Sequence, residues 1–193
     1  MFAPDQESLY PLFLRLAGRT VLVVGAGPVA ERKIAALLAS RARVRVVAPH
    51  ATKTIRLLAE HGRIAWDERK FNESDVDGVW LALAATSDSE AQRRVADACE
   101  ARQTFLVAVD DPPNASAYSG AVVKRPPFLI AISSSGEAPA LARLLREILE
   151  QVIPGETWVE HARRLRAKWR ADDSPMADRF GELVKEFKQR VER

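Results

Sequence analysis

The sequence is poor in the residues that build disulfides and metal sites. Cys99 is the only cysteine among 193 residues, which excludes an intramolecular disulfide and any metal site made of several cysteines. The three histidines, His50, His61 and His161, lie far apart, and none stands in a metal-ligand spacing such as H-E-x-x-H. We therefore expect no metal site, and we expect Cys99 to be a small buried residue of a helix.

Long apolar runs and a strong charge excess are also missing. No run approaches the roughly 20 apolar residues that span a bilayer, and the opening residues MFAPDQESLYPLF lack the basic stretch of an export signal. The 29 Lys and Arg nearly balance the 26 Asp and Glu, so the net charge of +3 gives little reason to expect nucleic acid. The basic segment 163–170 is best explained as a solvated helix face. We expect a cytoplasmic protein with neither a membrane nor a nucleic-acid partner.

What the sequence does contain, from Thr20 onward, is an alternation of short β-branched runs with helical patterns. Apolar runs at 20–24, 43–49, 63–66, 79–86 and 104–109 predict strands, and amphipathic segments after several of them predict helices. Such an alternation indicates βαβ units and therefore a parallel sheet with helical crossovers. The run at 79–85 is apolar on both faces, which suits a buried central strand.

The most specific local motif is the Gly-Ala-Gly-Pro-Val-Ala sequence at 25–30. It follows a predicted strand directly and opens a predicted helix, the context that a G-x-G-x-x-G/A dinucleotide fingerprint requires. Gly25 permits a tight turn, Gly27 lets the backbone approach a pyrophosphate, and Ala30 allows close packing of helix and strand. The free N–H groups of the first helical turn then face the anion, although Pro28 removes one donor. A glycine-rich turn without a ligand is the alternative.

The repeat ends after Asp110. The loop DDPPNASAYSG is rich in turn residues, two further strands are expected within 121–135, a helix at 137–154, and two helices after Pro154-Gly155. The sequence thus predicts an α/β fold in which a Rossmann-type parallel sheet is followed by a small α+β segment and a C-terminal helical region.

The choice between NAD and NADP stays open at this level. An NAD site normally has an acid at the end of the second strand, but here that strand ends Val-Ala-Pro49-His50. His50 or Lys53 can approach a 2′-phosphate, or both are ordinary exposed loop residues.

Polar residues follow three other predicted strands. Thr86-Ser-Asp88 and Asp110-Asp111 lie where open α/β sheets bind ligands. A carboxylate there can act as a general base, or either aspartate can simply cap the DDPP turn. If the strand stays extended through both aspartates, their side chains point to opposite sides. Ser133-Ser-Ser135, before the next helix, is either a helix cap or an anion cradle.

Four segments in order resemble one family, precorrin-2 dehydrogenase of sirohaem synthesis. They are YPLFLRLAGRTVLVVGAGPVAERK, LALAATSD, VAVDDP and AISSSGEAPALARLLRE, and the resemblance covers about residues 9 to 154. In some organisms this module is fused to a methyltransferase, for which 193 residues leave no room, so the stand-alone form is expected. In others it also inserts iron.

The resemblance implies NAD as acceptor, a homodimer with intertwined central segments and a cleft for a tetrapyrrole with eight carboxylates. It implies an NAD-binding Rossmann domain at 1–112, a dimerisation segment at 113–154 and a C-terminal helical region at 155–193. The family's catalytic acid falls on Asp110 and its active-site serine on Ser134, and Arg32-Lys33 also match the family. The residues expected to bind the cofactor are Gly25, Ala26, Gly27, Pro28, Val29, Ala30, Pro49 and Thr86.

The chain departs from the family at four positions. Val107 replaces the usual asparagine of N-V-V-D, Ala117 and Gly120 replace an aromatic residue and a proline, and Gln92 replaces an asparagine. These changes flank the expected site and bear on substrate handling, especially chelation.

The leading hypothesis is an oxidoreductase that passes a hydride from precorrin-2 to NAD while Asp110 assists removal of a proton, giving sirohydrochlorin. One alternative is a ferrochelatase that inserts Fe²⁺ into sirohydrochlorin, with Asp110 accepting pyrrole protons. Another is a nucleotide- or tetrapyrrole-binding protein without catalysis. Dehydrogenation needs NAD and chelation does not, so a cofactor requirement separates the first two hypotheses, and binding without turnover identifies the third.

Overall fold

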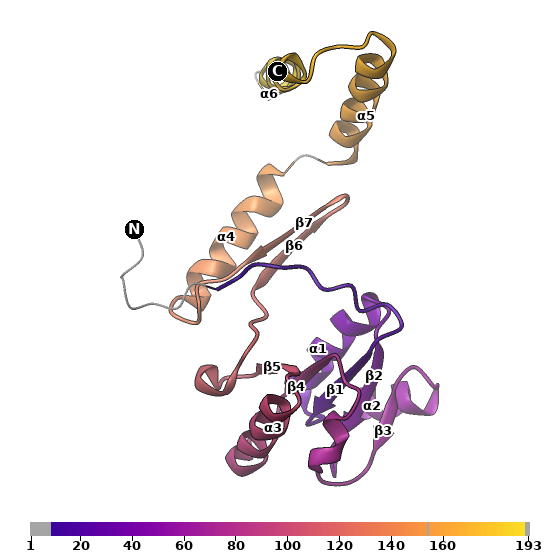
Figure 1. Ribbon diagram of the computed structural model, residues 1–193, viewed down its shortest axis with the longest axis vertical. Helices are drawn as coiled ribbons and strands as arrows, with labels where there is room; N and C mark the ends of the chain where they lie inside the picture. Colours follow the sequence, from indigo (N-terminus) through magenta and orange to yellow (C-terminus); the bar gives the residue numbers. More distant parts are fainter. Residues whose placement is uncertain (1–8, 154, 192–193) are drawn as a thin grey trace. The chain divides into compact units, whose positions relative to one another are not determined.

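The computed structural model describes residues 9–153 and 155–191, apart from a few side chains in the last two helices. The chain forms two compact units, the first ending at Ser119 and the second beginning at Gly120. Each unit is described by itself (Figure 1).

The first unit is a parallel five-stranded sheet with strand order β3-β2-β1-β4-β5, and every neighbouring pair of strands runs parallel. The prediction of βαβ units is therefore confirmed. The strands are β1 (Thr20–Val24), β2 (Arg43–Val47), β3 (Ala65–Asp67), β4 (Leu81–Ala84) and β5 (Phe105–Ala108). The helices are α1 (Pro28–Ala39), α2 (Lys53–Glu60) and α3 (Ser89–Ala101), with 3-10 turns η1 (Glu73–Val76) and η2 (Pro112–Asn114).

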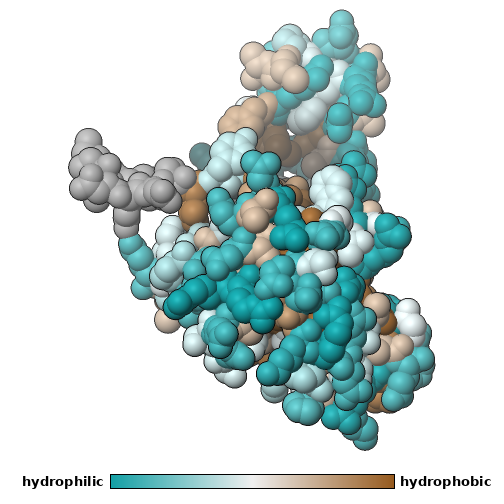
Figure 2. All heavy atoms as spheres, turned by 60° about the horizontal axis from the view of Figure 1, so that its bottom comes forward, coloured by the Kyte–Doolittle hydropathy of each residue, from teal (hydrophilic) through white to brown (hydrophobic). Residues whose placement is uncertain are grey.

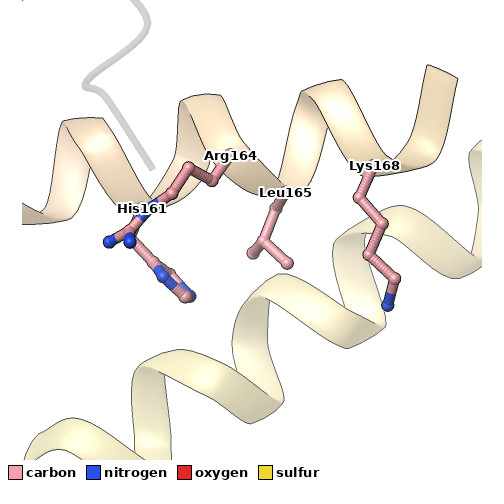
Figure 3. Close-up of a pocket in the computed structure, with 4 residues that line it drawn as sticks. All are labelled: His161, Arg164, Leu165 and Lys168. Atoms are coloured by element: carbon pink, nitrogen blue, oxygen red, sulfur yellow. The ribbon is translucent and has the colours of Figure 1, made fainter. Parts of the chain in front are cut away.

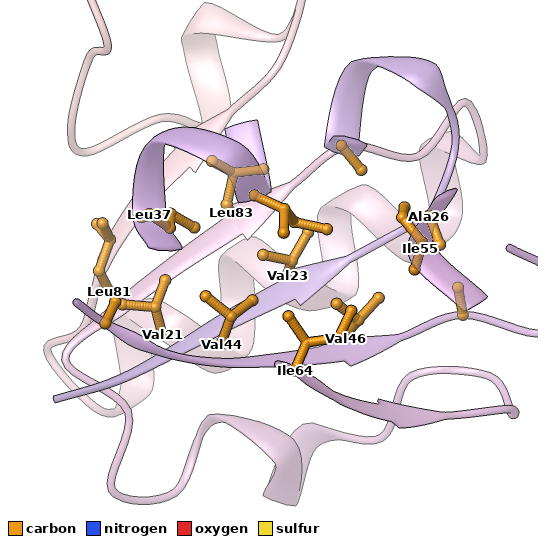
Figure 4. Packing of buried hydrophobic residues seen from close by; sticks show 14 of the residues in the cluster. Val21, Val23, Ala26, Leu37, Val44, Val46, Ile55, Ile64, Leu81 and Leu83 are labelled. Atoms are coloured by element: carbon orange, nitrogen blue, oxygen red, sulfur yellow. The ribbon is translucent and has the colours of Figure 1, made fainter. Parts of the chain in front are cut away.

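Apolar side chains on both faces of the sheet form the core. Val21 and Val23 point into one cluster with α1 and α2 (Figure 4), while Leu22 and Val24 point into another with α3 and η1. This two-sided burial explains why β1 is apolar at every position rather than at alternate ones. Each fully buried aliphatic side chain contributes roughly 1.5–3 kcal/mol of transfer free energy to the stability of the fold. All of β4 is buried, as its sequence predicted.

The second unit begins with an antiparallel hairpin, β6 (Ala121–Arg125) and β7 (Phe128–Ile132), turned by Pro126 and Pro127. Helix α4 (Pro139–Val152) packs on this hairpin, and Val123 and Ala142 are buried. The family-like α+β segment is thus present as two strands and a helix.

Two helices end the second unit, α5 (Glu156–Ala171) and α6 (Met176–Val191). Leu165 and Trp169 of α5 are buried, and Figure 3 shows Leu165 pointing toward α6. Lys168 Nζ donates to Glu182 at 3.0 Å, and the His161 ring nitrogen Nε2 lies 3.1 Å from Glu186. A hollow of about 310 Å³ on α5 is lined by His161, Arg164, Leu165 and Lys168.

Within the described ranges, no helix combines the length and the apolar character that crossing a bilayer requires.

Candidate functional site

The carboxyl ends of β1 and β4 mark the point where the strand order reverses. Chain connections leave β1 toward β2 on one side, and β4 and β5 lie on the other. In open α/β sheets, ligands bind in the crevice at this switch point. Most of the residues predicted from the sequence lie in the loops at this edge.

Gly25, the first glycine of the fingerprint, is required by the fold itself. Its φ is +102°, and a Cβ there would lie 2.3 Å from the carbonyl oxygen of Ala85. Its N–H donates to the Val47 carbonyl at 3.0 Å. Gly25 therefore lets the loops after β1 and β4 approach each other closely, a contact that no other residue type permits.

Gly27, the second glycine of the fingerprint, is not required by the fold in this way. Its backbone is extended at φ −84° and ψ −175°, and a Cβ there would meet no protein atom within 4 Å. Gly27 is the N-cap residue of α1 and supplies no side-chain cap to the first turn. The space that its missing side chain leaves, in front of a helix N-terminus, fits the approach of a pyrophosphate.

The next residues begin α1 as predicted. Pro28 occupies the first turn, where its missing N–H costs least, and Val29 follows it half-buried. Ala30 is fully buried in the cluster that α1 forms with β1. Ala26 is buried, and its carbonyl accepts the Thr52 N–H at 3.1 Å, which ties the glycine loop to the loop after β2.

The loop after β2 contains no Asp or Glu side chain that could bind the ribose hydroxyls of a dinucleotide. Pro49 and His50 are exposed, and Lys53 is the exposed first residue of α2. Glu31 of α1 accepts a hydrogen bond from the Thr52 hydroxyl at 2.7 Å. The carboxylate next to this loop is therefore already engaged.

In the loop after β4, Thr86 and Asp88 have different roles, although the sequence suggested both as site residues. Thr86 is half-buried beside Gly25, and its Oγ1 accepts the Asp88 N–H at 3.2 Å. Asp88 caps α3 by accepting the N–H groups of Glu90 and Ala91, both at 3.0 Å. Asp88 is thus a helix cap, and Thr86 remains the candidate.

The structure distinguishes the two aspartates that follow β5. Asp111 Oδ2 accepts the Asn114 side-chain N–H at 2.7 Å and so holds the turn. Asp110 is exposed, and within the described residues its carboxylate accepts no hydrogen bond. The assumption of an extended strand through both residues is wrong, because β5 ends at Ala108 and Asp110 is left-handed at φ +57°.

Two contacts that the sequence did not reveal surround Asp110. Gln92, buried in α3, donates to the Val109 carbonyl at 3.1 Å and fixes the backbone just before Asp110. Lys33 of α1 donates to the Ser119 hydroxyl at 2.5 Å. Burial and the neighbouring Arg32 lower the pKa of Lys33, and the Asp110 carboxylate opposes that decrease.

Ser134 belongs to the second unit, in the loop between β7 and α4. Its Oγ accepts the Ala138 N–H at 3.1 Å, and Ser133 Oγ accepts the Ser135 N–H at 3.1 Å. Both serines therefore hydrogen-bond the backbone of the loop itself. The helix-cap role expected for this loop is wrong, because the N-cap residue of α4 is Ala138 and none of the described side chains caps the helix. The Ser134 hydroxyl keeps its hydrogen for a further acceptor.

The departures from the family pattern are accommodated in the packing. Val107 is buried in the core cluster of the α1 face, and Ala117 packs against the same cluster. A Cβ on Gly120 would lie 2.1 Å from the Ile132 carbonyl oxygen, so only glycine fits there. An asparagine at position 107 would have to be hydrogen-bonded in that core.

Among the residues with described positions, no group of three or more His, Cys, Asp and Glu side chains could hold a metal ion. Cys99 is buried in α3, as predicted, and burial raises the pKa of its thiol to about 11. The thiol is therefore protonated at neutral pH and is a poor nucleophile.

Comparisons with known proteins agree with this geometry. The sequence model of the family described as "Putative NAD(P)-binding" matches residues 12–121, and the one described as "Sirohaem biosynthesis protein central" matches residues 130–151. Siroheme synthase 1 of Cronobacter sakazakii is 46% identical over 144 residues, which cover 75% of this chain and 31% of that protein. Siroheme synthase of an Enterobacter species is 39% identical over 172 residues, covering 88% and 37%. The chain thus spans about a third of the length of these relatives.

Among solved structures, SirC, precorrin-2 dehydrogenase, superposes with a TM-score of 0.74 at 23% identity, covering 92% of this chain and 88% of that one. The two chains therefore share a fold, and the predicted fold class is confirmed. Since the first sequence model matches more than half of the chain, the chain belongs to this NAD(P)-binding family.

Proposed function

We propose that the protein oxidises precorrin-2 to sirohydrochlorin with NAD⁺ as hydride acceptor. The observation that carries this proposal is the pairing, within one unit, of an open glycine loop with a carboxylate that the fold does not use. Gly27 leaves space at the N-terminus of α1, and Asp110 has no hydrogen-bond donor within the described residues. The siroheme synthase relatives support the substrate class.

In this proposal, the α1 N-terminus and the glycine loop would hold the pyrophosphate of the cofactor, and Thr86 and Pro49 would contact the cofactor from the loops after β4 and β2. When bound, the oxidised nicotinamide takes a hydride, that is, one hydrogen with both electrons of a C–H bond. The substrate must lose one further proton to complete the two-electron oxidation. Asp110 accepts that proton and returns it to solvent, so that the products are sirohydrochlorin, NADH and a proton.

For Ser134 we propose direct contact with the substrate. Its oxygen is already fixed by the Ala138 N–H, so the hydroxyl orientation is restricted and its hydrogen is available to a carboxylate. Ser134→Ala would remove both bonds.

The direct test is anaerobic incubation of the protein with precorrin-2 and either NAD⁺ or NADP⁺, followed by absorbance spectroscopy. We expect the sirohydrochlorin spectrum with NAD⁺ and a much slower reaction with NADP⁺, because the family resemblance implies NAD. Addition of Fe²⁺ after turnover, and separately to sirohydrochlorin without cofactor, measures chelation. A cofactor-independent metal insertion without any dehydrogenation would overturn the proposal in favour of the chelatase. Binding of NAD⁺ and tetrapyrrole without turnover would leave only a binding protein.

We also propose a homodimer that forms through the segment 113–154. Helix α4 exposes a stripe of apolar side chains at helical spacing, and Figure 2 shows hydrophobic residues exposed on a largely hydrophilic surface. The stripe consists of Leu141, Leu144, Leu145, Ile148 and Val152, all at least 41% exposed in the single chain. A second copy that covers this stripe would remove it from water.

Light scattering tests the dimer. Wild type at micromolar concentration should show the mass of two chains. Leu144→Glu combined with Ile148→Glu should shift the mass toward one chain, because a dimer would bury the two glutamate carboxylates without partners of opposite charge. Leu57→Glu is the matched control, since Leu57 on α2 is also exposed, at 42%. A wild-type mass of one chain would contradict the dimer.

The three-part division at residues 112 and 154 remains our proposal for the working domains, with NAD bound by the first. We propose a cytoplasmic location as well, supported by the single reduced cysteine.

A further inference from the structure

Lys33 is a half-buried cation whose environment leaves its charge without a counterion. Its ammonium donates to the Ser119 hydroxyl at 2.5 Å, and across the described parts of the chain no carboxylate lies within ion-pair distance. A partly desolvated ammonium with a neutral partner is unfavourable, which agrees with the lowered pKa of Lys33. Neither the dinucleotide fingerprint nor the sheet requires a lysine at this position.

The same backbone framework places Lys33 and Asp110 near one another. The N–H groups of Ser116 and Ala117 both donate to the Leu106 carbonyl, at 3.0 and 2.9 Å, so the segment that ends at Ser119 is held on β5. Asp110 follows the same strand, and its carboxylate favours the charged form of Lys33 and so raises the pKa of that lysine against the effect of burial.

Lys33 and Asp110 nevertheless form no ion pair. The charges of Lys33 and Asp110 interact electrostatically but are not in direct contact. A polar group of a ligand can therefore lie next to both of them. An ammonium has three N–H donors, and Ser119 uses one of them. The remaining donors suit a carboxylate, and a tetrapyrrole substrate carries such groups around its ring.

We propose that Lys33 binds a carboxylate of the tetrapyrrole and so positions the ring against Asp110, which makes Lys33 a specificity-determining residue of the site. The inference rests on the proposed function, because it takes its ligand from that reaction. In the proposed function, the cofactor phosphates bind instead at the N-terminus of α1, which precedes Lys33 in the same helix.

The test compares Lys33→Met with wild type in two binding measurements and one kinetic measurement. Titration with sirohydrochlorin, followed by its absorbance, should show a dissociation constant raised by about tenfold or more, since one charge-assisted hydrogen bond is lost. The dissociation constant for NAD⁺, measured by calorimetry, should change less than about twofold. In turnover, KM for precorrin-2 should rise by a similar factor while kcat falls much less.

Three further variants sharpen the result. Lys33→Arg keeps the charge and should recover part of the tetrapyrrole affinity, whereas Arg32→Met removes the neighbouring exposed cation and should leave it unchanged. Lys33→Gln is a second neutral variant whose amide can still bond Ser119, so it decides the question if the methionine variant unfolds.

The outcomes separate this inference from the function on which it rests. Wild type that neither binds sirohydrochlorin nor oxidises precorrin-2 would overturn both. Normal wild-type activity together with wild-type tetrapyrrole affinity in Lys33→Met and Lys33→Gln would overturn the role of Lys33 alone. Loss of NAD⁺ affinity with unchanged tetrapyrrole affinity would also overturn it, because the lysine would then serve the cofactor.

Discussion

Replacing Asp110 with asparagine is expected to slow sirohydrochlorin formation by about 100-fold or more, the usual cost of losing a general base. Asparagine has nearly the same shape but cannot accept the proton that the substrate loses. The fold and the affinity for NAD⁺ should survive, because the Asp110 side chain makes no hydrogen bond within the described residues. Asparagine also tolerates the left-handed backbone that Asp110 adopts. Anaerobic rate measurements, thermal unfolding and calorimetric titration with NAD⁺ check the three expectations.

Asp111→Asn is the matched control, one residue along the same loop. Asp111 holds the η2 turn through the Asn114 side chain, and an asparagine oxygen can accept that bond equally well. This variant should therefore keep nearly the full rate. Near-wild-type rates in both variants would rule out the role of Asp110, and a defect confined to Asp111→Asn would identify the other carboxylate as the base.

The fold was predictable because its strongest signals are local. Buried parallel strands are apolar at every position, so β1 and β4 are visible as continuous runs such as TVLVV and LALA. The glycine fingerprint is equally local, since the turn, the strand before it and the helix after it are contiguous in sequence. Strand ends were less accurate: β3 begins at Ala65 rather than at Arg63, and β5 ends at Ala108. Single-residue limits depend on hydrogen bonds to neighbouring strands, which the sequence does not show.

The contacts around the candidate base could not be predicted, because they join residues that are distant in the chain. Lys33 and Ser119 are 86 residues apart, and Gln92 reaches the Val109 carbonyl across 17 residues. The two neighbouring aspartates also looked equivalent as turn residues. Only the position of Asn114, which bonds Asp111, shows which carboxylate the fold uses.

The two glycines of the fingerprint should respond to substitution in opposite ways. Gly25→Ala is expected to destabilise the protein by about 3 kcal/mol, because the added methyl meets the Ala85 carbonyl and the positive φ disfavours any side chain. Thermal or denaturant unfolding measures that loss. Any decrease in NAD⁺ binding by this variant would follow from the damaged fold.

Gly27→Val, by contrast, should fold and yet bind NAD⁺ about 100-fold more weakly, since its side chain would fill the space meant for the pyrophosphate. Valine is a poor N-cap residue, so a modest loss of stability, about 1 kcal/mol or less, is expected as well. Gly27→Ser removes that ambiguity. Serine is a better N-cap than glycine and should keep or raise the unfolding temperature, while its Cβ and hydroxyl still obstruct the anion.

A variant that is more stable and binds less cofactor cannot be explained by damage to the fold. Such a result would show that glycine at position 27 is there for the ligand, because the protein itself accommodates a side chain at that point. Calorimetry that finds equal NAD⁺ affinity in folded Gly27→Val and Gly27→Ser would instead mean that the pyrophosphate does not approach this loop. The turn would then be a glycine-rich connection without a ligand, and the cofactor site would have to be sought elsewhere on the sheet edge.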